Sequence, residues 1–530
     1  MRKEVIFGLI FITCGSARAL PRWIGVTGSV GTYGEVYRMR GRDPRRDPTT
    51  GRMYVRPVLT VFGMSFPFEV LVSTEETKFR QPFNRFGISP RWKWATFHLG
   101  DFSPRFSQLT LNGVALRGGG VELSPWPLRL AVVVGRSQRA VVAVGGMGAY
   151  RRTLWAVKVG LGGRTGNFLD LVLIRAADDT SSVDSVGVAP QENLVVGVNG
   201  QVRLSRARSF LRWEAAGSVH TRDLRSSELE DVPVPEGIRR FYTLRLSTKV
   251  DYAYRIEAGF RLPRVGFQVG YGRIGPGFVS LGVSSAVNDR RRLSLRTNVE
   301  VVEGKFRFRG HYTRYRDNLK GQKQHTTVRE SASLSLEGRP ARAVGLGMRY
   351  SRNTVGNDSE NDTTKVDVYS DRYTLNASFD LKLLGVLNSL RTSFSVQRSE
   401  RRNPVRPVKG FDVRSFTVGL NSRVSDGLSL SPSVGLTSNR ASDGTRSSTY
   451  IYSLSVDHSA LRRKLSDGLR MSLKRAGDAS SLNLNLSGRL RLTSSDALTL
   501  KVRMTRYEHG SDPGRGFREV TAGLGFDHRF

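Results

Sequence analysis

Apolar and polar residues alternate with a period of two along most of the chain after Leu194. In residues 481–493, five leucines share one face of the expected strand: Leu482, Leu484, Leu486, Leu490 and Leu492. The intervening positions carry Ser, Asn, Arg and Thr, and successive side chains of a strand point to opposite faces. The same alternation predicts strands with one apolar and one polar face in residues 244–261, 373–382, 428–437 and 498–505.

Two kinds of connection separate these strands. Short polar turns are expected at residues 302–305, 337–341, 425–427 and 493–497, and longer loops at 317–326, 351–371, 401–410, 438–448 and 509–516. Because the two kinds alternate, short and long connections lie at opposite ends of the strands, which is typical of transmembrane barrels. Alternation alone would also fit a soluble β-sandwich, but tyrosines collect beside the long loops, as an interfacial girdle requires. The expected girdle consists of Tyr312, Tyr315, Tyr350, Tyr373, Tyr450, Tyr452 and Tyr507.

The last strand alternates up to the terminal residue, with Val520, Ala522, Leu524, Phe526, His528 and Phe530 in one phase. This closely resembles the C-terminal signature of bacterial outer-membrane β-barrels of Gram-negative type, which ends in an aromatic residue preceded by apolar residues at alternate positions. The resemblance implies that Phe526, His528 and Phe530 form an assembly signal read by the barrel assembly machinery. His528 departs from the signature, which more often has an aromatic or aliphatic residue there.

The N-terminus has the order of features expected of a cleaved export signal. Arg2 and Lys3 precede an apolar stretch at 5–12, and Ala17-Arg18-Ala19 forms an A-x-A site, so residues 1–19 are predicted to be a signal peptide. Cys14, the one cysteine of the chain, lies within this segment. The mature protein is therefore expected in the bacterial outer membrane without disulfides, after passage with periplasmic chaperones.

The predicted fold class is all-β, a single large antiparallel transmembrane β-barrel of about 24–26 strands. Residues 20–126 are expected to form N-terminal strands and residues 127–530 the barrel proper. Side chains cannot fill so wide a lumen, so it is either a water channel or plugged. Within 75–126, Pro90, Pro104 and the Gly118–Gly120 run favour a plug-like segment, a folded-in loop, or bulged strands at the barrel seam.

Two short stretches resemble segments of the large translocon barrel of the type IX secretion and gliding system. They are residues 99–102 with 109–114, and residues 274–282 with 288–289, together less than about a tenth of the chain. The resemblance implies a Bacteroidetes-like outer membrane and passage of a polypeptide instead of a solute.

Positive charge dominates the composition: 83 Lys and Arg stand against 46 Asp and Glu, a formal net charge of +37. On a barrel wall the basic residues of the polar faces would point into the lumen and attract anions. The expected pore-lining residues are Arg245, Lys249, Arg255, Arg307, Arg309, Arg349, Arg489, Arg491, Lys501 and Arg503. The alternative is that arginine only solvates the lumen, paired with Asp251, Glu257, Glu337 and Asp380. Nucleic acid is not expected as a partner, because the basic residues alternate along strands and form no single patch.

Three functions follow from this pattern. The first is a conduit for anionic solutes, the second a secretion or assembly component whose lumen holds a plug or a polypeptide cargo, and the third a structural or adhesion barrel that acts through its external loops. Outer-membrane lipid and lipopolysaccharide are the expected surroundings. No catalytic motif accompanies the scattered histidines, so no enzyme and no cofactor are predicted. Acidic clusters at 178–184, 228–236 and 358–362 are interpreted as solvated loop surface in preference to calcium sites, and no metal site is predicted.

Overall fold

The computed structural model describes residues 21, 23–74, 85–142, 148–163, 165–183, 187–204, 208–229, 241–284, 287–302, 305–383, 385–403 and 405–530, with the side chains of 406–409 left out. Regular structure in this part is almost entirely β-strand, with two short 3-10 turns at Thr180–Ser182 and Pro513–Arg515. No helix of the described part is long and apolar enough to cross a membrane. The expected signal peptide lies outside the described residues.

The strands follow one another around a single sheet. Their bounds are β1 Ile24–Arg40, β2 Thr49–Val61, β3 Met64–Ser73, β4 Arg85–Ile88, β5 Arg91–Trp92, β6 Ala95–Phe102, β7 Leu116–Leu123, β8 Leu128–Gln138, β9 Arg151–Gly162, β10 Phe168–Asp179, β11 Glu192–Leu204, β12 Ser209–Thr221, β13 Thr248–Arg261, β14 Val265–Ile274, β15 Arg290–Val301, β16 Phe306–Arg316, β17 Thr327–Ala341, β18 Val344–Asn357, β19 Asp367–Leu383, β20 Val386–Asn403, β21 Arg406–Ser425, β22 Leu428–Ala441, β23 Arg446–Ala460, β24 Leu465–Ala476, β25 Ala479–Arg491, β26 Asp496–His509 and β27 Phe517–Arg529.

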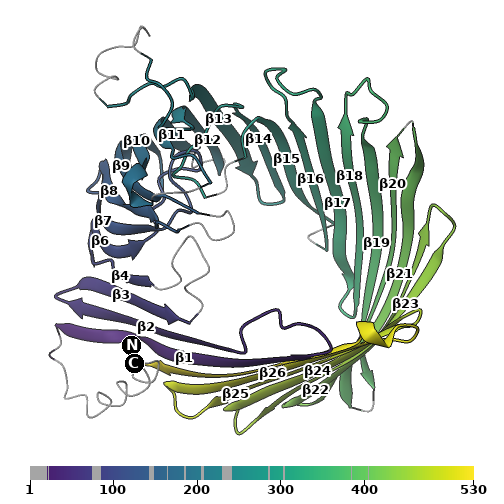
Figure 1. Cartoon of the computed structure of the whole chain (residues 1–530). Coiled ribbons are helices and arrows are strands. Elements are labelled where there is room, and N and C mark those ends of the chain that lie inside the picture. Colours follow the sequence, from purple (N-terminus) through teal and green to yellow (C-terminus); the bar gives the residue numbers. More distant parts are fainter. Residues whose placement is uncertain are drawn as a thin grey trace.

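The sheet closes on itself into a barrel (Figure 1). The strand pairings of the described residues are all antiparallel, and β1 pairs with both β2 and β27. Since β4 and β5 share one place between β3 and β6, the ring has 26 strand positions, within the predicted range. Closure gives the edge strands partners, which is how a sheet satisfies its backbone groups in lipid. The prediction of one large antiparallel β-barrel is confirmed.

The closing seam depends on small residues opposite an aromatic one. Tyr33 of β1 lies beside Gly525 in the register with β27, and a Cβ atom added to Gly523 would lie 2.2 Å from the Tyr33 hydroxyl oxygen. The glycines therefore make room for the ring where the first and last strands meet. The Phe530 N–H donates to the carbonyl oxygen of Gly28, and this contact holds the C-terminus against β1.

The weakest seam lies where the sequence is rich in Pro and Gly. β4 has four residues and β5 has two, and β4 pairs with β6 at only two positions, Gly87 with Gly100 and Ile88 with Leu99. Gly100 has φ +87°, a left-handed conformation that glycine adopts without steric cost. Residues 85–102, for which bulged strands at the seam were one of the alternatives, form the short strands β4 and β5 and the strand β6, and residues 75–84 lie outside the described part.

The connections differ from the expected loops. Residues 317–326 join β16 to β17 as predicted, but only residues 358–366, 404–405 and 442–445 separate the strands where longer loops were expected. β19, β20 and β21 have 17, 18 and 20 residues, although about 9–11 are enough to cross a bilayer. These hairpins therefore extend beyond the membrane. Sequence alternation missed the extensions because strand residues outside the bilayer need not keep an apolar face.

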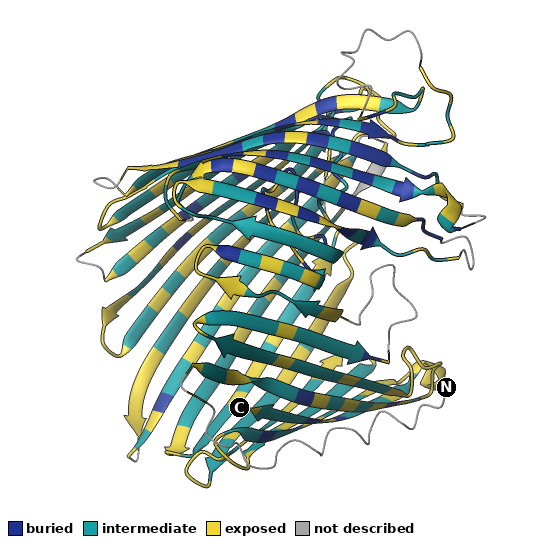
Figure 2. Ribbon diagram, turned by 90° about the vertical axis from the view of Figure 1, so that its left-hand side faces the viewer, coloured by how far each residue is buried: buried dark blue, intermediate teal, exposed yellow. Residues whose placement is uncertain are grey.

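The two faces of the wall have opposite chemistry, and the alternation of exposed and covered residues is visible along the strands in Figure 2. On β10, Leu169 and Leu171 are exposed on the outer face, while the intervening Asp170 and Val172 are buried toward the inside. On β19, Tyr373 and Leu375 are exposed outward. An apolar outer face and a polar or covered inner face are the arrangement required of a barrel in lipid.

Candidate functional site: the inner wall of the barrel

Two connections fold inward and cover part of the inner wall. We call them the infolded segments, residues 103–115 between β6 and β7, and residues 275–284 between β14 and β15. Their apolar side chains form one core with inward-facing residues of β8–β13; its members include Phe106, Leu109, Leu111, Val114, Phe278, Val133, Leu154, Ile174, Val195, Ala216 and Ala253. This is the largest apolar core of the described chain, and it lies inside the ring of strands.

Backbone hydrogen bonds join the two infolded segments to each other. The Asn112 N–H donates to the Gly282 carbonyl oxygen at 2.8 Å, and the Ser284 N–H donates to the Asn112 carbonyl oxygen at 3.2 Å. The Ser280 hydroxyl donates to the Thr110 carbonyl oxygen at 2.6 Å. Such contacts satisfy buried backbone groups that water cannot reach, so the pair behaves as one packed unit.

The wall binds the first infolded segment through charged side chains. Glu214 of β12 accepts a hydrogen bond from the Leu109 N–H. Lys158 of β9 is 9% exposed, and its ammonium lies 4.7 Å from the centre of the Phe106 ring. A cation over an aromatic face is attracted by the ring, and more strongly when both are shielded from water. Residues 103–115 are therefore a folded-in loop, another of the alternatives expected for 75–126.

A second layer of loop contacts holds the other infolded segment at the loop end of the barrel. Asp251 of β13 accepts hydrogen bonds from the Gly277 N–H at 2.9 Å and from the Lys320 ammonium at 3.0 Å. Asp289 pairs with the Lys323 ammonium at 2.6 Å and accepts from the Leu319 N–H at 2.8 Å. The loop 317–326 thus reaches back to Asp251, which also holds Gly277, and to Asp289.

The titration of Asp289 follows from these partners. Burial raises the pKa of the Asp289 carboxyl, but the Lys323 ammonium and the backbone N–H groups of Leu319 and Asn318 outweigh burial and hold its pKa below 3.8, the usual value. The carboxylate is therefore the favoured form at neutral pH, and it keeps the loop contact charged.

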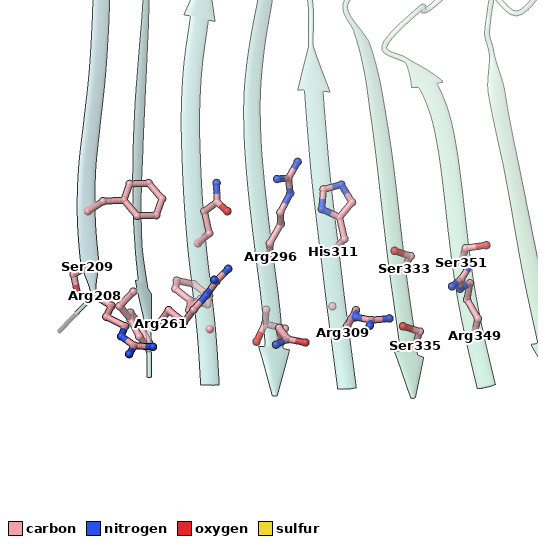
Figure 3. Close-up of a pocket in the computed structure, with 18 of the residues that line it drawn as sticks. Arg208, Ser209, Arg261, Arg296, Arg309, His311, Ser333, Ser335, Arg349 and Ser351 are labelled. Atoms are coloured by element: carbon pink, nitrogen blue, oxygen red, sulfur yellow. The ribbon is translucent and has the colours of Figure 1, made fainter. Parts of the chain in front are cut away.

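Beyond the infolded core, the inner wall is lined by arginine. A cavity of about 1330 Å³ lies along β11–β19, on the side of the barrel where the short turns lie. Its basic lining residues are Arg203, Arg208, Arg212, Arg261, Arg296, Arg309, Arg349 and Arg372, with His311 among them, and its lining includes no Asp or Glu. Figure 3 shows Arg296, Arg309, His311 and Arg349 projecting from neighbouring strands into the same space. Arg212 shares its face of β12 with Glu214, which contacts the infolded segment, so the cavity belongs to the inner face.

Strand register orders this lining into two rows. One row runs across the strands through Arg296, His311, Ser333, Ser351 and Arg372. The other row, two residues nearer the short turns, runs through Arg309, Ser335, Arg349 and Thr374. Neighbouring strands lie about 4.8 Å apart, so each row spans three or four strand spacings of wall with basic groups at or near its ends. We call this set the arginine–serine site.

Carboxylates neutralise only part of the positive charge. Glu337 of β17 lies between Arg309 and Arg349 and pairs with both, at 2.9 Å and 3.3 Å. Arg212 pairs with Glu257 at 3.5 Å. By contrast, no described carboxylate forms an ion pair with Arg208, Arg261 or Arg296. The inner wall therefore combines paired and unpaired arginines, and neither sequence alternative describes it alone.

The ten basic residues expected to line the pore occupy several environments. Arg309 and Arg349 line the cavity, and Arg307 lines an adjoining cavity of about 890 Å³. Arg255 contacts Gln108 of an infolded segment, while Arg245 lies before β13 and pairs with Glu228 at 2.7 Å. The others lie in the inward phase of their strands: Lys249 beside the second infolded segment, and Arg489, Arg491, Lys501 and Arg503 on β25 and β26. Their role as a pore lining stays a prediction.

The expected tyrosine girdle divides between the two faces. Tyr312, Tyr350, Tyr373, Tyr450 and Tyr452 share the outward phase of their strands with apolar residues. Tyr315 instead shares the phase of Arg309 and His311, and its ring lies 4.8 Å from the Arg290 guanidinium. Tyr507 shares the phase of Arg503 and stacks on Phe517 at 5.4 Å. Position beside a long loop did not distinguish these two from the others, although the strand phase in the sequence would have.

Sequence reasoning also missed several cavity residues. Arg208, Arg261, Arg296 and Arg372 were not among the expected pore-lining residues, although each lines the same cavity as Arg309 and Arg349. Arg296 and Arg372 could have been found by extending the alternation through β15 and β19. The sequence could not show that these arginines share one cavity, because residues between 208 and 372 are brought together only by the register of the strands.

The residues expected to form the assembly signal lie at the closing seam. His528 pairs in register with Val30 of β1 and Asp496 of β26, and its Nδ1 lies 2.6 Å from an Asp496 oxygen. Phe526 lies opposite Thr32 of β1 and Leu498 of β26. Among the described side chains, no group of three or more His, Cys, Asp or Glu is placed to hold a metal ion.

Comparison with known proteins gives likeness at low similarity. No family model and no curated protein matches the chain. Among solved structures, the siderophore receptor PirA from Pseudomonas aeruginosa is 12% identical over 95% of this chain and 80% of that one, with a TM-score of 0.38. OpdQ from Pseudomonas aeruginosa is 12% identical over 70% and 98%, with a TM-score of 0.35. An anion-selective porin from Comamonas acidovorans is 12% identical over 52% and 100%, with a TM-score of 0.28.

The closed antiparallel wall and its apolar outer face together define the class of fold. The chain is a single large closed β-barrel of the architecture that spans a membrane with strands. Because each TM-score is below 0.5, this assignment rests on the chain's own strand pairing and not on the likenesses.

Proposed function

We propose that the protein is a conduit across the bacterial outer membrane that favours anionic solutes. The observation that carries this proposal is the cavity of about 1330 Å³ on the inner wall, lined by eight arginines and no carboxylate. A wall of one sign of charge with a low-dielectric surround concentrates counter-ions at its surface and repels ions of its own sign. Arginine keeps its charge at any physiological pH, so the preference would persist throughout that range.

The infolded segments set the route of such a conduit. They cover the inner face of β8–β13, whereas the arginine–serine site lies on β15–β19 beyond them. Solute would pass along the uncovered part of the wall, where Ser, Thr, Asn and Arg alternate with outward apolar residues. A packed obstruction on one side of a wide barrel narrows the passage and brings the solute closer to the basic wall.

The test is the reversal potential of single channels formed by the mature chain in a planar bilayer under a potassium chloride gradient. We expect a potential of the sign that indicates chloride preference. The double variant Arg261→Gln/Arg296→Gln should move it toward zero, because both arginines lie in the cavity without a described carboxylate partner. The matched control is Arg440→Gln/Arg475→Gln, two arginines in the outward phase of β22 and β24. Cation preference, or an equal effect of the control, would refute the proposal.

A secretion or assembly component is the second candidate. It is supported by the infolded core, which occupies lumen space with buried apolar side chains such as Leu111 and Phe278. A correctly folded barrel that conducts no ions in the bilayer would favour this candidate over the anion conduit.

A further inference from the structure

The four hydroxyl groups at the centre of the arginine–serine site have no described protein partner. Ser333, Ser335, Ser351 and Thr374 line the cavity, and no described hydrogen bond involves their side chains. Ser335 is 9% exposed, so its hydroxyl is largely shielded by the surrounding wall. Polar groups in such positions usually bind each other, the backbone or a ligand. The hydroxyls are therefore available donors on the floor of a basic cavity.

Basic side chains lie around this floor. His311 is in the same row as Ser333; its Nε2 atom is 2.9 Å from the Thr313 hydroxyl oxygen, and its Nδ1 atom is buried without a described partner. Arg296 lies on β15 at one end of this row, and Arg372 lies on β19 at the other end, where its guanidinium also donates to the Gln397 amide oxygen. Figure 3 shows Arg296, His311, Ser333 and Ser351 in one band, with Arg309, Ser335 and Arg349 below it.

One contact within the wall shows how two arginines bind the same carboxylate. The carboxylate of Glu337 lies between Arg309 and Arg349 and forms a salt bridge with each, across the width of β17. Arginines two strands apart can thus converge on a single negatively charged group. In the upper row, Arg296 and Arg372 lie four strands apart, twice the separation of Arg309 and Arg349, and the cavity lining includes no carboxylate between them.

We propose that the arginine–serine site binds the phosphate group of small phosphorylated solutes. A guanidinium presents a planar fork of N–H donors that matches two phosphate oxygens, and hydroxyls donate to the remaining ones. Chloride is a single spherical ion, so it cannot contact the arginines and several hydroxyls at the same time as phosphate oxygens can. The hydroxyls should therefore strengthen binding of phosphate more than binding of chloride. The cavity volume of about 1330 Å³ leaves space for a body attached to the phosphate. This inference rests on the proposed conduit, since it names the class of solute that the same wall recognises.

The first experiment measures block of the chloride current of the mature chain by glycerol phosphate, with glycerol as the probe that lacks phosphate. We expect glycerol phosphate to block the current at a concentration at which glycerol does not. The hydroxyl variant Ser333→Ala/Ser335→Ala/Ser351→Ala should raise the half-blocking concentration about tenfold, as expected for losing hydrogen bonds to a charged group. Its chloride preference should remain, because no charge is removed.

The matched control is Ser453→Ala/Ser455→Ala/Ser472→Ala, three serines in the inward phase of β23 and β24, away from the cavity. Glycerol phosphate should block the chloride current of this control at the same concentration as that of the unchanged protein. Arg296→Gln/Arg372→Gln should weaken both the block and the chloride preference. Equal block in the hydroxyl variant and its control would overturn the phosphate site.

A binding measurement separates failure of this site from failure of the conduit. Equilibrium dialysis of inorganic phosphate against the detergent-solubilised chain does not require ion flow. Binding that the hydroxyl variant weakens, in a protein that conducts nothing, would support the site and refute the conduit. Chloride-selective current without variant-sensitive phosphate binding would refute the site and leave the conduit standing.

Discussion

Removal of the Leu111 side chain should release the infolded segments from the wall. Leu111 is fully buried, at 0% exposure, among Phe278 and the inward residues of β8–β13. A buried Leu→Ala change costs about 2–5 kcal/mol, from lost burial and the cavity it leaves. The strands do not depend on this side chain, since their closure is made by backbone pairing, so the cost acts mainly on docking of the segments.

The size of the effect follows from that cost. A loss of about 3 kcal/mol raises the undocked population about a hundredfold, because each 1.4 kcal/mol is a factor of ten. Two assays report undocking: trypsin cleavage after Arg105, which lies in the first infolded segment, and the frequency of larger conductance levels in a planar bilayer. We expect both to increase in Leu111→Ala.

The matched control is Leu171→Ala, on the outer face of β10, where the side chain is 59% exposed. It removes the same atoms from the same part of the barrel without touching the infolded core. The reasoning would be refuted by unchanged cleavage and conductance in Leu111→Ala, or by equal changes in the two variants.

Three further changes test other contacts. Gly197→Val should displace the same segment, because a Cβ atom there would lie 2.5 Å from the Thr110 methyl carbon, whereas Gly217→Val, with no described atom within 4 Å of its Cβ, should leave trypsin cleavage unchanged. Because the pKa of Asp289 is lowered in the folded protein, its contact with Lys323 stabilises the loop at every pH above 3.8, the usual pKa, and this stabilisation is lost as the pH falls through the lower, folded pKa. Hydrogen exchange of residues 317–326 should therefore accelerate only below about pH 4, and Asp289→Asn should remove that step. Hydrogen exchange should also be faster in β4 and β5 than in β16 or β25, whose pairing extends over the whole strand; equal protection would contradict the weak-seam interpretation.

Much of the wall could be predicted from residues 428–505. There the apolar positions of consecutive strands keep one phase, as in Leu484 on β25 opposite Met504 on β26. Lipid on one side and water on the other impose that alternation locally, strand by strand. The antiparallel order then follows from the short turns, and a count of strands gives the size of the ring.

The strand ends were less predictable. Residues 351–357 and 367–371 lie in β18 and β19, although their composition is that of a polar loop. Outside the bilayer both faces of a hairpin meet water, so the alternation that identifies a transmembrane strand disappears while the backbone pairing continues.

The sequence by itself determined the class of fold, and it predicts an export signal at one end and an assembly signal at the other. Each depends on periodicity or on a short segment, so residues close together in the sequence are enough to indicate it. Only the tertiary structure decided that residues 103–115 and 275–284 pack together inside the ring, and that arginines from 208 to 372 share one cavity. Those contacts join residues more than 100 positions apart, and barrel closure and strand register, not local pattern, bring them together.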